Sequence, residues 1–408
     1  MMVGGSAEHA HVAVLEDDVL VEHYVTRKAR RSIVGNVYLG RVQNVLAGME
    51  AAFVDIGQPR NAVLYAGELA PETEIEGAST PRIEQMLRPG QTVLVQVTKD
   101  PMGTKGARLT TIVSLAGRYL VLLPNGSGYG ISRRLSDDER NRLRDIARGI
   151  RPDGYGLVIR TAAEGAGADE LLRDLNRLVR LWEEIDRRKQ KAQAPLEIYV
   201  EPDLVIRVVR DLFSKDFDRL VVEDPDVYDR VSKYVEAVDP ELSQRVQLHE
   251  GPLRMFDSYQ VTEQLRKALE RKVWLPSGGY IVVDRTEAFT VIDVNSGKYV
   301  GRSNLEDTVV RINLEAADEV VRQLRLRDIG GIIVIDFIDM LMAQNREAIL
   351  RAFRTALERD KTKTQVIGIS PLGLVEMTRK NVSEGLVEAL STPCPACEGR
   401  GVVIEDIG

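Results

Sequence analysis

Two aspartates in the C-terminal third of the chain have a side-chain type and a position suited to holding a divalent cation. Asp293 follows the apolar run 289–292, and Asp336 follows the apolar run 332–335. Each run is typical of a β-strand, and ligands of α/β sheets gather at the carboxyl ends of the strands. Two carboxylates brought together there repel each other, and a hard cation with oxygen ligands relieves that repulsion. The sequence therefore predicts a magnesium site formed by these two aspartates.

The chemistry available to such a site is the activation of a phosphodiester. A bound Mg²⁺ polarises the phosphate and lowers the pKa of a coordinated water molecule. Asn295, two residues after Asp293, would add an amide oxygen or hold a carboxylate in place. The spacing also fits a structural alternative, in which Asp336 or Asp339 caps the helix that follows and Asp293 closes an Asx turn.

The only two cysteines of the chain, Cys394 and Cys397, form one C-x-x-C motif. This motif supplies two thiolates, whereas a closed structural zinc site takes four ligands. The simplest solution is a zinc ion shared between two chains, because the histidines show no ligand spacing (His9, His11, His23 and His249). A redox-active C-x-x-C is the alternative.

The residues around the two aspartates predict an α/β unit. Residues 280–283 and 289–292 are typical of a hairpin closed by residues 284–288. A helix follows, with apolar residues at helical spacing (Val309, Ile312, Ala316, Val320 and Leu324). Residues 332–335 are apolar on both faces and are therefore predicted to form a central strand. A helix over 343–359 and a strand over 366–369 complete the unit.

The N-terminal half has a different pattern. Short strands are predicted over 33–42, 51–57 and 92–97, and Gly- and Pro-rich loops separate them. This spacing favours a small barrel, of which the oligonucleotide-binding OB-fold is one kind. Residues 68–86 are predicted to be a variable loop, and residues 169–191 an amphipathic helix whose apolar stripe is a core face.

Composition and charge limit the class of protein. The 408 residues suggest about three domains, and no apolar run approaches the roughly 18 residues that cross a bilayer. The start of the chain lacks a secretory signal, so a cytoplasmic location is expected. The net charge is −7, yet basic residues are grouped in segments that would neutralise RNA phosphates or form solvated helix faces (27–31, 131–151 and 173–191).

Seven longer motifs resemble the core of the ribonuclease E/G family, most closely its E branch. They occur in the family's order and span most of the chain. They are SLAGRYL (114–120), GISRR (130–134), IDVNS (292–296), NLEAADE (313–319), QLRLRD (323–328), DFIDM (336–340) and GLVEMTR (373–379).

The resemblance implies a multidomain α/β architecture. An RNase H-like subdomain would be split between residues 1–34 and 203–268. An S1-type OB-fold at 35–111 and a 5′-phosphate sensor at 112–202 would be inserted in it. A DNase I-like catalytic subdomain at 269–390 and a zinc link at 391–401 would follow.

The resemblance also implies the activity, which is magnesium-dependent hydrolytic cleavage of single-stranded RNA by an endonuclease in mRNA decay and in rRNA and tRNA processing. Asp293 and Asp336 would bind the catalytic magnesium, with Asn295 supporting them by hydrogen bonding. Cys394 and Cys397 would bind a zinc ion shared by two chains, in a tetramer built from two such dimers. Chains of the E branch carry long extensions that recruit other RNA-decay enzymes. This sequence stops shortly after the zinc link, so we expect it to be a shortened form of such a chain.

Family members sense the RNA 5′ end with residues that correspond to Arg160 and Thr161. An arginine fork beside a hydroxyl suits a terminal phosphate; the alternative is that Thr161 caps local structure and Arg160 makes a surface ion pair. Lys363 stands where the family has a sensor-assisting arginine, and a lysine lacks the bidentate fork.

In the barrel, the family places RNA on an aromatic residue at Phe53 and a basic residue at Lys105. Base stacking on an aromatic ring is usual in such folds, although a phenylalanine alone is more typical of a core. The chain departs from the family at Val63, where a second phenylalanine is expected.

Two other classes of protein remain open from the sequence. A non-catalytic RNA-binding scaffold would keep the barrel and the basic segments but would not need both strand-end aspartates. An exonuclease of the RNase H type would show more acidic residues in its site.

Overall fold

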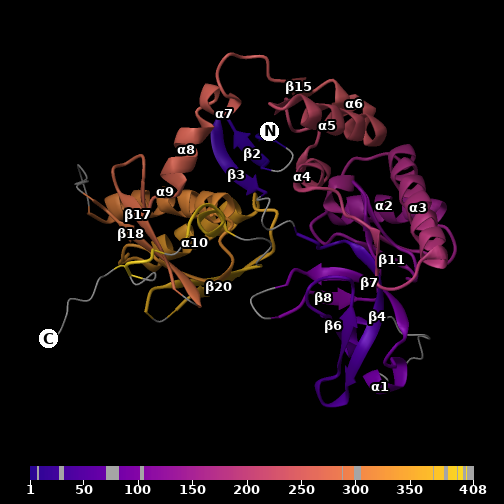
Figure 1. Ribbon diagram of the computed structural model, residues 1–408. Coiled ribbons are helices and arrows are strands. Elements are labelled where there is room, and N and C mark those ends of the chain that lie inside the picture. Colours follow the sequence, from indigo (N-terminus) through magenta and orange to yellow (C-terminus); the bar gives the residue numbers. More distant parts are fainter. Residues whose placement is uncertain are drawn as a thin grey trace. The chain divides into compact units, whose positions relative to one another are not determined.

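A computed structural model describes residues 1–6, 9–26, 32–69, 82–101, 105–286, 288–297, 305–370, 372–380, 385–392, 394–397 and 401 (Figure 1). The basic segment 27–31 and residues 70–81 of the predicted variable loop lie outside this described part. The chain forms two compact units. The first unit contains residues 1–25, 221–225 and 248–408, and the second contains residues 26–220 and 226–247.

A mixed six-stranded sheet carries the two aspartates in the first unit. Its strands, in spatial order, are β16 (Lys272–Trp274), β17 (Tyr280–Arg285), β18 (Phe289–Asn295), β19 (Gly331–Asp336), β21 (Val375–Arg379) and β20 (Thr364–Ile369). The β17–β18 hairpin confirms the sequence prediction. β18 runs parallel to β19, whereas every other neighbouring pair is antiparallel. β18 also continues through Asp293 to Asn295, so the prediction that this strand ends before Asp293 was wrong.

The two faces of this sheet have different surroundings. Helices α9 (Leu305–Leu326) and α10 (Ala343–Leu357) pack on one face, and alternate strand residues such as Ile292 and Ile335 join them in a buried core. On the opposite face, here called the open face, Ile332 is 46% exposed. β19 therefore has the predicted central place between β18 and β21, but it is not buried on both faces.

The remaining elements of the first unit include strands from the N-terminus. β1 (Met2–Gly4) pairs in parallel with β14 (Leu220–Val222) and antiparallel with β2 (His11–Glu16), which pairs with β3 (Val19–Val25). The other elements of this unit are short; they are α7 (Met255–Ser258), α8 (Val261–Ala268) and α11 (Leu386–Leu390), and β15 (Val246–Leu248) has its last residue in this unit.

A closed five-stranded barrel confirms the prediction for the first part of the second unit. Its strands are β4 (Val37–Leu46), β5 (Ala51–Asp55), β6 (Ala62–Tyr65), β8 (Arg108–Thr110) and β7 (Thr92–Lys99), and β7 pairs again with β4. This arrangement is consistent with an OB-like fold. β4 begins at Val37 rather than at residue 33, because Gly35 has a φ of +92°, which extended strands do not adopt.

The rest of the second unit combines a small sheet with helices. The predicted amphipathic helix is α3 (Ala168–Lys191); most of its apolar stripe packs in the core, whereas Leu172, at one edge of the stripe, is exposed. The remaining elements are η2 (Ala47–Met49), η3 (Ala66–Glu68), α1 (Ile83–Met86), β9 (Leu115–Ala116), β10 (Leu120–Leu123), β11 (Tyr129–Ile131), α2 (Asp137–Ile150), β12 (Gly156–Ile159), η4 (Thr161–Ala163), β13 (Leu196–Tyr199), α4 (Leu204–Leu212), α5 (Pro225–Val238) and α6 (Pro240–Ser243). Among the described residues, no helix has the length and apolar character needed to cross a membrane.

Candidate functional site

Strand pairing brings the two predicted aspartates side by side. Asp293 of β18 and Asp336 of β19 are direct partners in the parallel ladder. Adjacent strands lie about 4.8 Å apart, and paired residues project from the same face of the sheet. Both side chains are exposed on the open face. The sheet therefore presents two neighbouring carboxylates to solvent.

The electrostatics of this pair are those of two acids that repel each other. Partial desolvation raises the pKa of Asp336, and the negative charges of Asp293 and Asp339 raise it further. A divalent cation would reverse this effect, because it favours the charged form of each carboxylate. Among the described residues, no group of three or more His, Cys, Asp or Glu side chains is placed to hold a metal ion. Two exposed carboxylates nevertheless fit Mg²⁺, which takes one or two in proteins and keeps several waters.

Asn295 lies on the same face and holds one of the two acids. Its Nδ2 donates a hydrogen bond of 2.7 Å to Oδ2 of Asp293. Of the two roles predicted for Asn295, the structure shows the contact needed to hold a carboxylate in place. The bond fixes one Asp293 oxygen and leaves the other carboxylate oxygen for a ligand.

The structural alternative for the two aspartates is wrong. The residue at the N-cap of α10 is Met342, and it is Glu306 of α9 that accepts hydrogen bonds from the backbone N–H groups of Leu341 and Met342, both of 3.2 Å. Neither Asp336 nor Asp339 therefore caps this helix. Asp293 lies inside β18 and so closes no turn.

The loop that follows Asp336 is held by a buried asparagine of α9. Asn313 is fully buried; its Nδ2 donates to the carbonyl oxygen of Ile338 at 2.8 Å, and its Oδ1 accepts from the N–H of Ile338 at 3.1 Å. Together with Glu306, this clamp fixes the backbone on the carboxyl side of Asp336. Sequence reasoning missed both residues, although an asparagine directly after an apolar-stripe position of a helix is a signal that could have found Asn313.

Replacing Asp336 with asparagine is expected to stabilise the metal-free fold. Because the folded-state pKa of Asp336 is raised, stability is lost as pH rises from the ordinary pKa of an aspartate through the raised value. At neutral pH the charged side chain therefore destabilises the fold, and the amide removes that effect. We expect the Tm in a metal chelator to rise by on the order of 1 °C, with the difference shrinking as pH falls. A lower Tm for the variant at neutral pH would contradict the repulsion.

Arg160 and Thr161 lie in the second unit, at the end of β12 and the start of η4. Nη1 of Arg160 donates to the carbonyl oxygen of Gly117 at 2.6 Å and forms an ion pair of 2.8 Å with Asp211. The Thr161 hydroxyl lies 2.8 Å from that of Ser132. The ion pair foreseen by the alternative interpretation is thus present, and the phosphate-sensing role stays a prediction.

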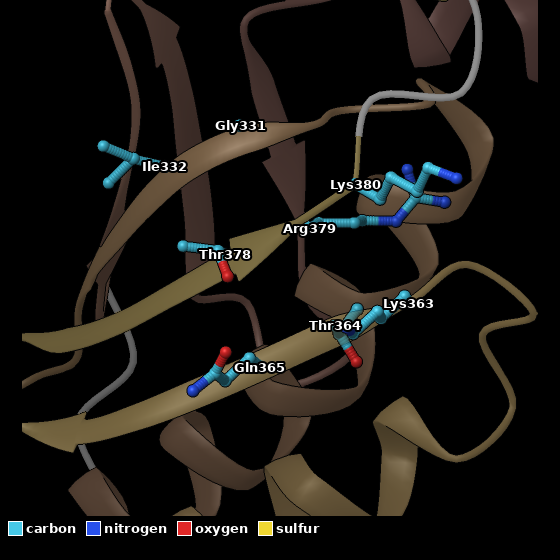
Figure 2. A pocket seen from close by; sticks show the side chains of 8 residues that line it. All are labelled: Gly331, Ile332, Lys363, Thr364, Gln365, Thr378, Arg379 and Lys380. Carbon is cyan, nitrogen blue, oxygen red and sulfur yellow. The ribbon is translucent and has the colours of Figure 1, made fainter. Parts of the chain in front are cut away.

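Lys363 belongs to the first unit and lines an open groove of about 410 Å³, shown in Figure 2. The groove runs across the starts of β19 and β20 and the end of β21. The register pairs Thr364 with Arg379 and Arg379 with Gly331, the first residue of β19. Asp336 is the last residue of β19, so Lys363 and the two aspartates lie at opposite ends of the sheet. Arg160 and Lys363 are in different units.

The outer face of the barrel carries Phe53 beside the residue at which the chain departs from the family. Phe53 of β5 pairs with Val63 of β6, and Val63 pairs with Arg108 of β8. Phe53 is half-buried and is not among the buried side chains of the barrel core. Lys105, just before β8, is exposed.

A second aromatic residue on this face was missed by sequence reasoning. Tyr65 lies two residues after Val63, so it projects from the same face, and it is 38% exposed. The Arg108 guanidinium carbon lies 5.1 Å from the centre of its ring, and Arg108 is held by an ion pair of 2.7 Å with Glu68. The alternation of apolar residues in β6 could have placed Tyr65 on this face.

The cysteine motif lies in the first unit. Cys394 is exposed, Cys397 is half-buried, and the two form no disulfide. Residues 395–397 form a turn, which brings the two thiol-bearing residues onto one short loop. A zinc ion shared between chains stays a prediction.

Comparison with known proteins identifies the family. The sequence model of the ribonuclease E/G family matches residues 114–382. The chain is 43% identical to ribonuclease G of Escherichia coli K12 over 410 residues, which cover 99% of this chain and 84% of that protein. It is 40% identical to ribonuclease E of Haemophilus influenzae and 41% to that of a Nostoc strain, covering 97% of this chain and 43% and 58% of those proteins. The chain belongs to the ribonuclease E/G family.

Proposed function

We propose that this protein is a magnesium-dependent hydrolytic endoribonuclease that cleaves single-stranded RNA, in mRNA decay and in rRNA and tRNA processing. Family membership supports the endoribonuclease class. The observation that carries the magnesium-dependent mechanism is the in-register pair Asp293 and Asp336 on the open face, with Asn295 bonded to Asp293. The proposed location is the cytoplasm.

The proposed architecture assigns a role to each part of the chain. The barrel is an S1-type OB-fold that grips RNA, and the sheet with β3 and β14 belongs to an RNase H-like subdomain. Residues 112–202 form the 5′-phosphate sensor, and the six-stranded sheet is the DNase I-like catalytic subdomain. Residues 391–401 form the zinc link.

Each residue of the site has its own role in the proposed hydrolysis. Asp293 and Asp336 would hold Mg²⁺, which when bound supplies Lewis-acid polarisation of the phosphate and a water of lowered pKa. Asn295 orients the Asp293 carboxylate through its 2.7 Å hydrogen bond. Asn313 fixes the loop after Asp336, so that this carboxylate keeps its place beside its partner.

Single-stranded RNA is the substrate that the barrel favours. Phe53 offers part of an aromatic ring on the outer face, and Tyr65 with Arg108 offers a ring and a positive charge a short distance away. Aromatic rings stack on bases only where the bases are unpaired. With valine at position 63, the second ring of this face is the one at Tyr65.

A circular single-stranded RNA incubated with the pure protein and magnesium tests the reaction class. An endonuclease opens the circle to a linear product of the same length, because it needs no free end. An exonuclease leaves the circle intact but degrades its linear form. Binding without any cleavage of either form would indicate a non-catalytic RNA-binding scaffold.

The proposed assembly is a dimer linked by zinc, with two dimers forming a tetramer. Cys394→Ser should release zinc and halve the particle mass measured by light scattering, since each zinc ion would need thiolates from both chains. Ser391→Ala, in the same segment, is the matched control and should leave both quantities unchanged. Unchanged mass and zinc content in the Cys394 variant would remove the link.

A further inference from the structure

Two aromatic rings and the ammonium group of a lysine form a cluster at the edge of the six-stranded sheet in the first unit. Trp274 ends the edge strand β16 and is 62% exposed. Its ring centre lies 5.4 Å from that of Tyr280, with the planes at 64°. Nζ of Lys272 lies 4.1 Å from the centre of the Trp274 ring and 3.4 Å from that of the Tyr280 ring. The sheet thus presents an indole whose orientation is fixed by a neighbouring ring and an ammonium group.

The strand register places this cluster on the same face as the two aspartates. Trp274 pairs with Tyr280, and Tyr280 pairs with Asn295. Asn295 lies two residues after Asp293 in β18, so all of these side chains and Asp336 project from the open face. β16 is two strands away from β18, which corresponds to about 10 Å across the sheet.

We propose that Trp274, oriented by Tyr280 and Lys272, is a base-stacking platform for a nucleotide of single-stranded RNA that flanks the phosphate at the Asp293–Asp336 pair. This proposal rests on the proposed function and deepens it. The Trp274 side chain is largely exposed, and stacking of one base on an aromatic ring strengthens binding roughly 5- to 150-fold. The Lys272 ammonium beside the ring attracts the phosphate of the stacked nucleotide.

The chemistry of the cluster favours RNA over a protein partner. A protein contact made by an exposed tryptophan buries it among apolar side chains, and placing an ammonium between two rings there would require its desolvation. A nucleotide needs both features, because it carries an aromatic base and a negative charge on adjoining groups. Two strand spacings and an offset of two residues put Trp274 about 12 Å from Asp293 along the sheet, and one more strand spacing puts it about 16 Å from Asp336, so a stacked nucleotide would lie within a few nucleotides of the phosphate to be cleaved.

Phe289 provides a matched control on the same sheet face. It is 46% exposed and lies four residues before Asp293 in β18, about 13 Å away along the strand. It begins the strand, whereas Trp274 and Asn295 lie at the carboxyl ends of theirs. If the loss of an exposed aromatic ring were the only cause, alanine at Phe289 and alanine at Trp274 would weaken RNA binding alike. If Trp274 is a platform beside the aspartates, only its replacement weakens RNA binding.

Tryptophan fluorescence tests the contact without relying on cleavage. The chain has two tryptophans, so Trp182→Phe leaves Trp274 as the single reporter. In this background, with Asp293→Asn to prevent turnover, a single-stranded RNA oligonucleotide should quench Trp274 with the same Kd as that found by fluorescence anisotropy of labelled RNA. A duplex of the same sequence should not quench. RNA binding without quenching would overturn the platform.

The second test measures cleavage kinetics in variants that keep both aspartates. Trp274→Ala should lower kcat/KM for a single-stranded substrate about tenfold, mainly through KM, and Trp274→Phe should restore most of it. Lys272→Gln should have a smaller effect that fades at high salt, and Phe289→Ala should change nothing. Equal losses in the Trp274→Ala and Phe289→Ala variants, or a change in particle mass with unchanged KM, would overturn the RNA platform and indicate a protein contact.

The fluorescence and kinetic tests distinguish a failure of this inference from a failure of the proposed function. If Asp293→Asn and Asp336→Asn retain full activity, the catalytic assignment fails whatever Trp274 reports. If those variants are inactive while Trp274 is neither quenched nor needed for a low KM, the catalytic assignment stands and the platform fails.

Discussion

Replacing Asp293 or Asp336 with asparagine should lower the kcat of RNA cleavage by several orders of magnitude, with little change in the Kd for RNA. Each substitution removes one of two carboxylates that lie side by side in the parallel ladder. A metal site with one carboxylate loses most of its affinity for Mg²⁺ and with it the Lewis acid. RNA binding depends largely on other surfaces and should persist. The measurement is kcat at saturating magnesium, together with a Kd from anisotropy.

Two further variants show whether the effect belongs to the pair. Asn295→Ala should lower kcat by roughly ten- to a hundredfold, because it releases the Asp293 carboxylate without removing a ligand. Asp284→Asn is the matched control, since Asp284 lies on the same sheet face but is paired with Arg271. It should leave kcat unchanged. Near wild-type turnover of either the Asp293 or the Asp336 variant would remove the site assignment.

An RNA with a 5′ monophosphate should be cleaved roughly ten- to a hundredfold faster than the same RNA with a 5′ hydroxyl. Charge-assisted hydrogen bonds to a phosphate are worth about 1.5–3 kcal/mol each. The contacts of Arg160 with Gly117 and Asp211 are both made by Nη1, and a guanidinium has five N–H donors. The side chain is thus held in place with donors left for a ligand. A 5′ triphosphate should be accommodated poorly in a pocket for one phosphate.

The variants of Arg160 separate sensing from a structural role. Arg160→Ala should slow cleavage of the monophosphorylated RNA to the rate of the hydroxyl form and leave the latter rate unchanged. Asp211→Asn is informative because the guanidinium groups of Arg160 and Arg210 hold the pKa of Asp211 below its usual value, against the effect of burial. Removing that charge should preserve or increase the preference for a phosphate. Equal slowing of both RNAs by Arg160→Ala would assign Arg160 to structure and make Lys363 the next candidate.

Local patterns in the sequence were sufficient to predict the strands and the helix that carry the candidate site. The apolar runs before Asp293 and Asp336 predicted two strands, and the helical stripe from Val309 to Leu324 predicted α9. These predictions succeeded because strand and helix periodicity depends on neighbours in the chain. The patterns in the N-terminal half predicted three of the five barrel strands, β4, β5 and β7, for the same reason, whereas the short strands β6 and β8 were not predicted.

The burial of strand faces and the bends of the chain were harder to predict from the sequence. Residues 332–335 have the composition of a strand covered on both sides, yet Ile332 is 46% exposed. Composition records which residues can be buried, whereas the elements that cover them come from elsewhere in the chain. The predicted start of β4 at residue 33 was wrong, because the φ of +92° at Gly35 bends the chain there. The apolar residues on either side of Gly35 still have the pattern of a strand.

The sequence by itself determined that each of two apolar runs of strand character is followed by an aspartate and that an asparagine accompanies the first. Only the tertiary structure decided that Asp293 and Asp336 are partners in one ladder, because a shift of one residue in register would have turned one of them to the opposite face. The same holds for Trp274, whose place on the open face follows from two successive antiparallel pairings. Register is set by the packing of the whole sheet on α9 and α10, and that packing depends on residues far apart in the chain.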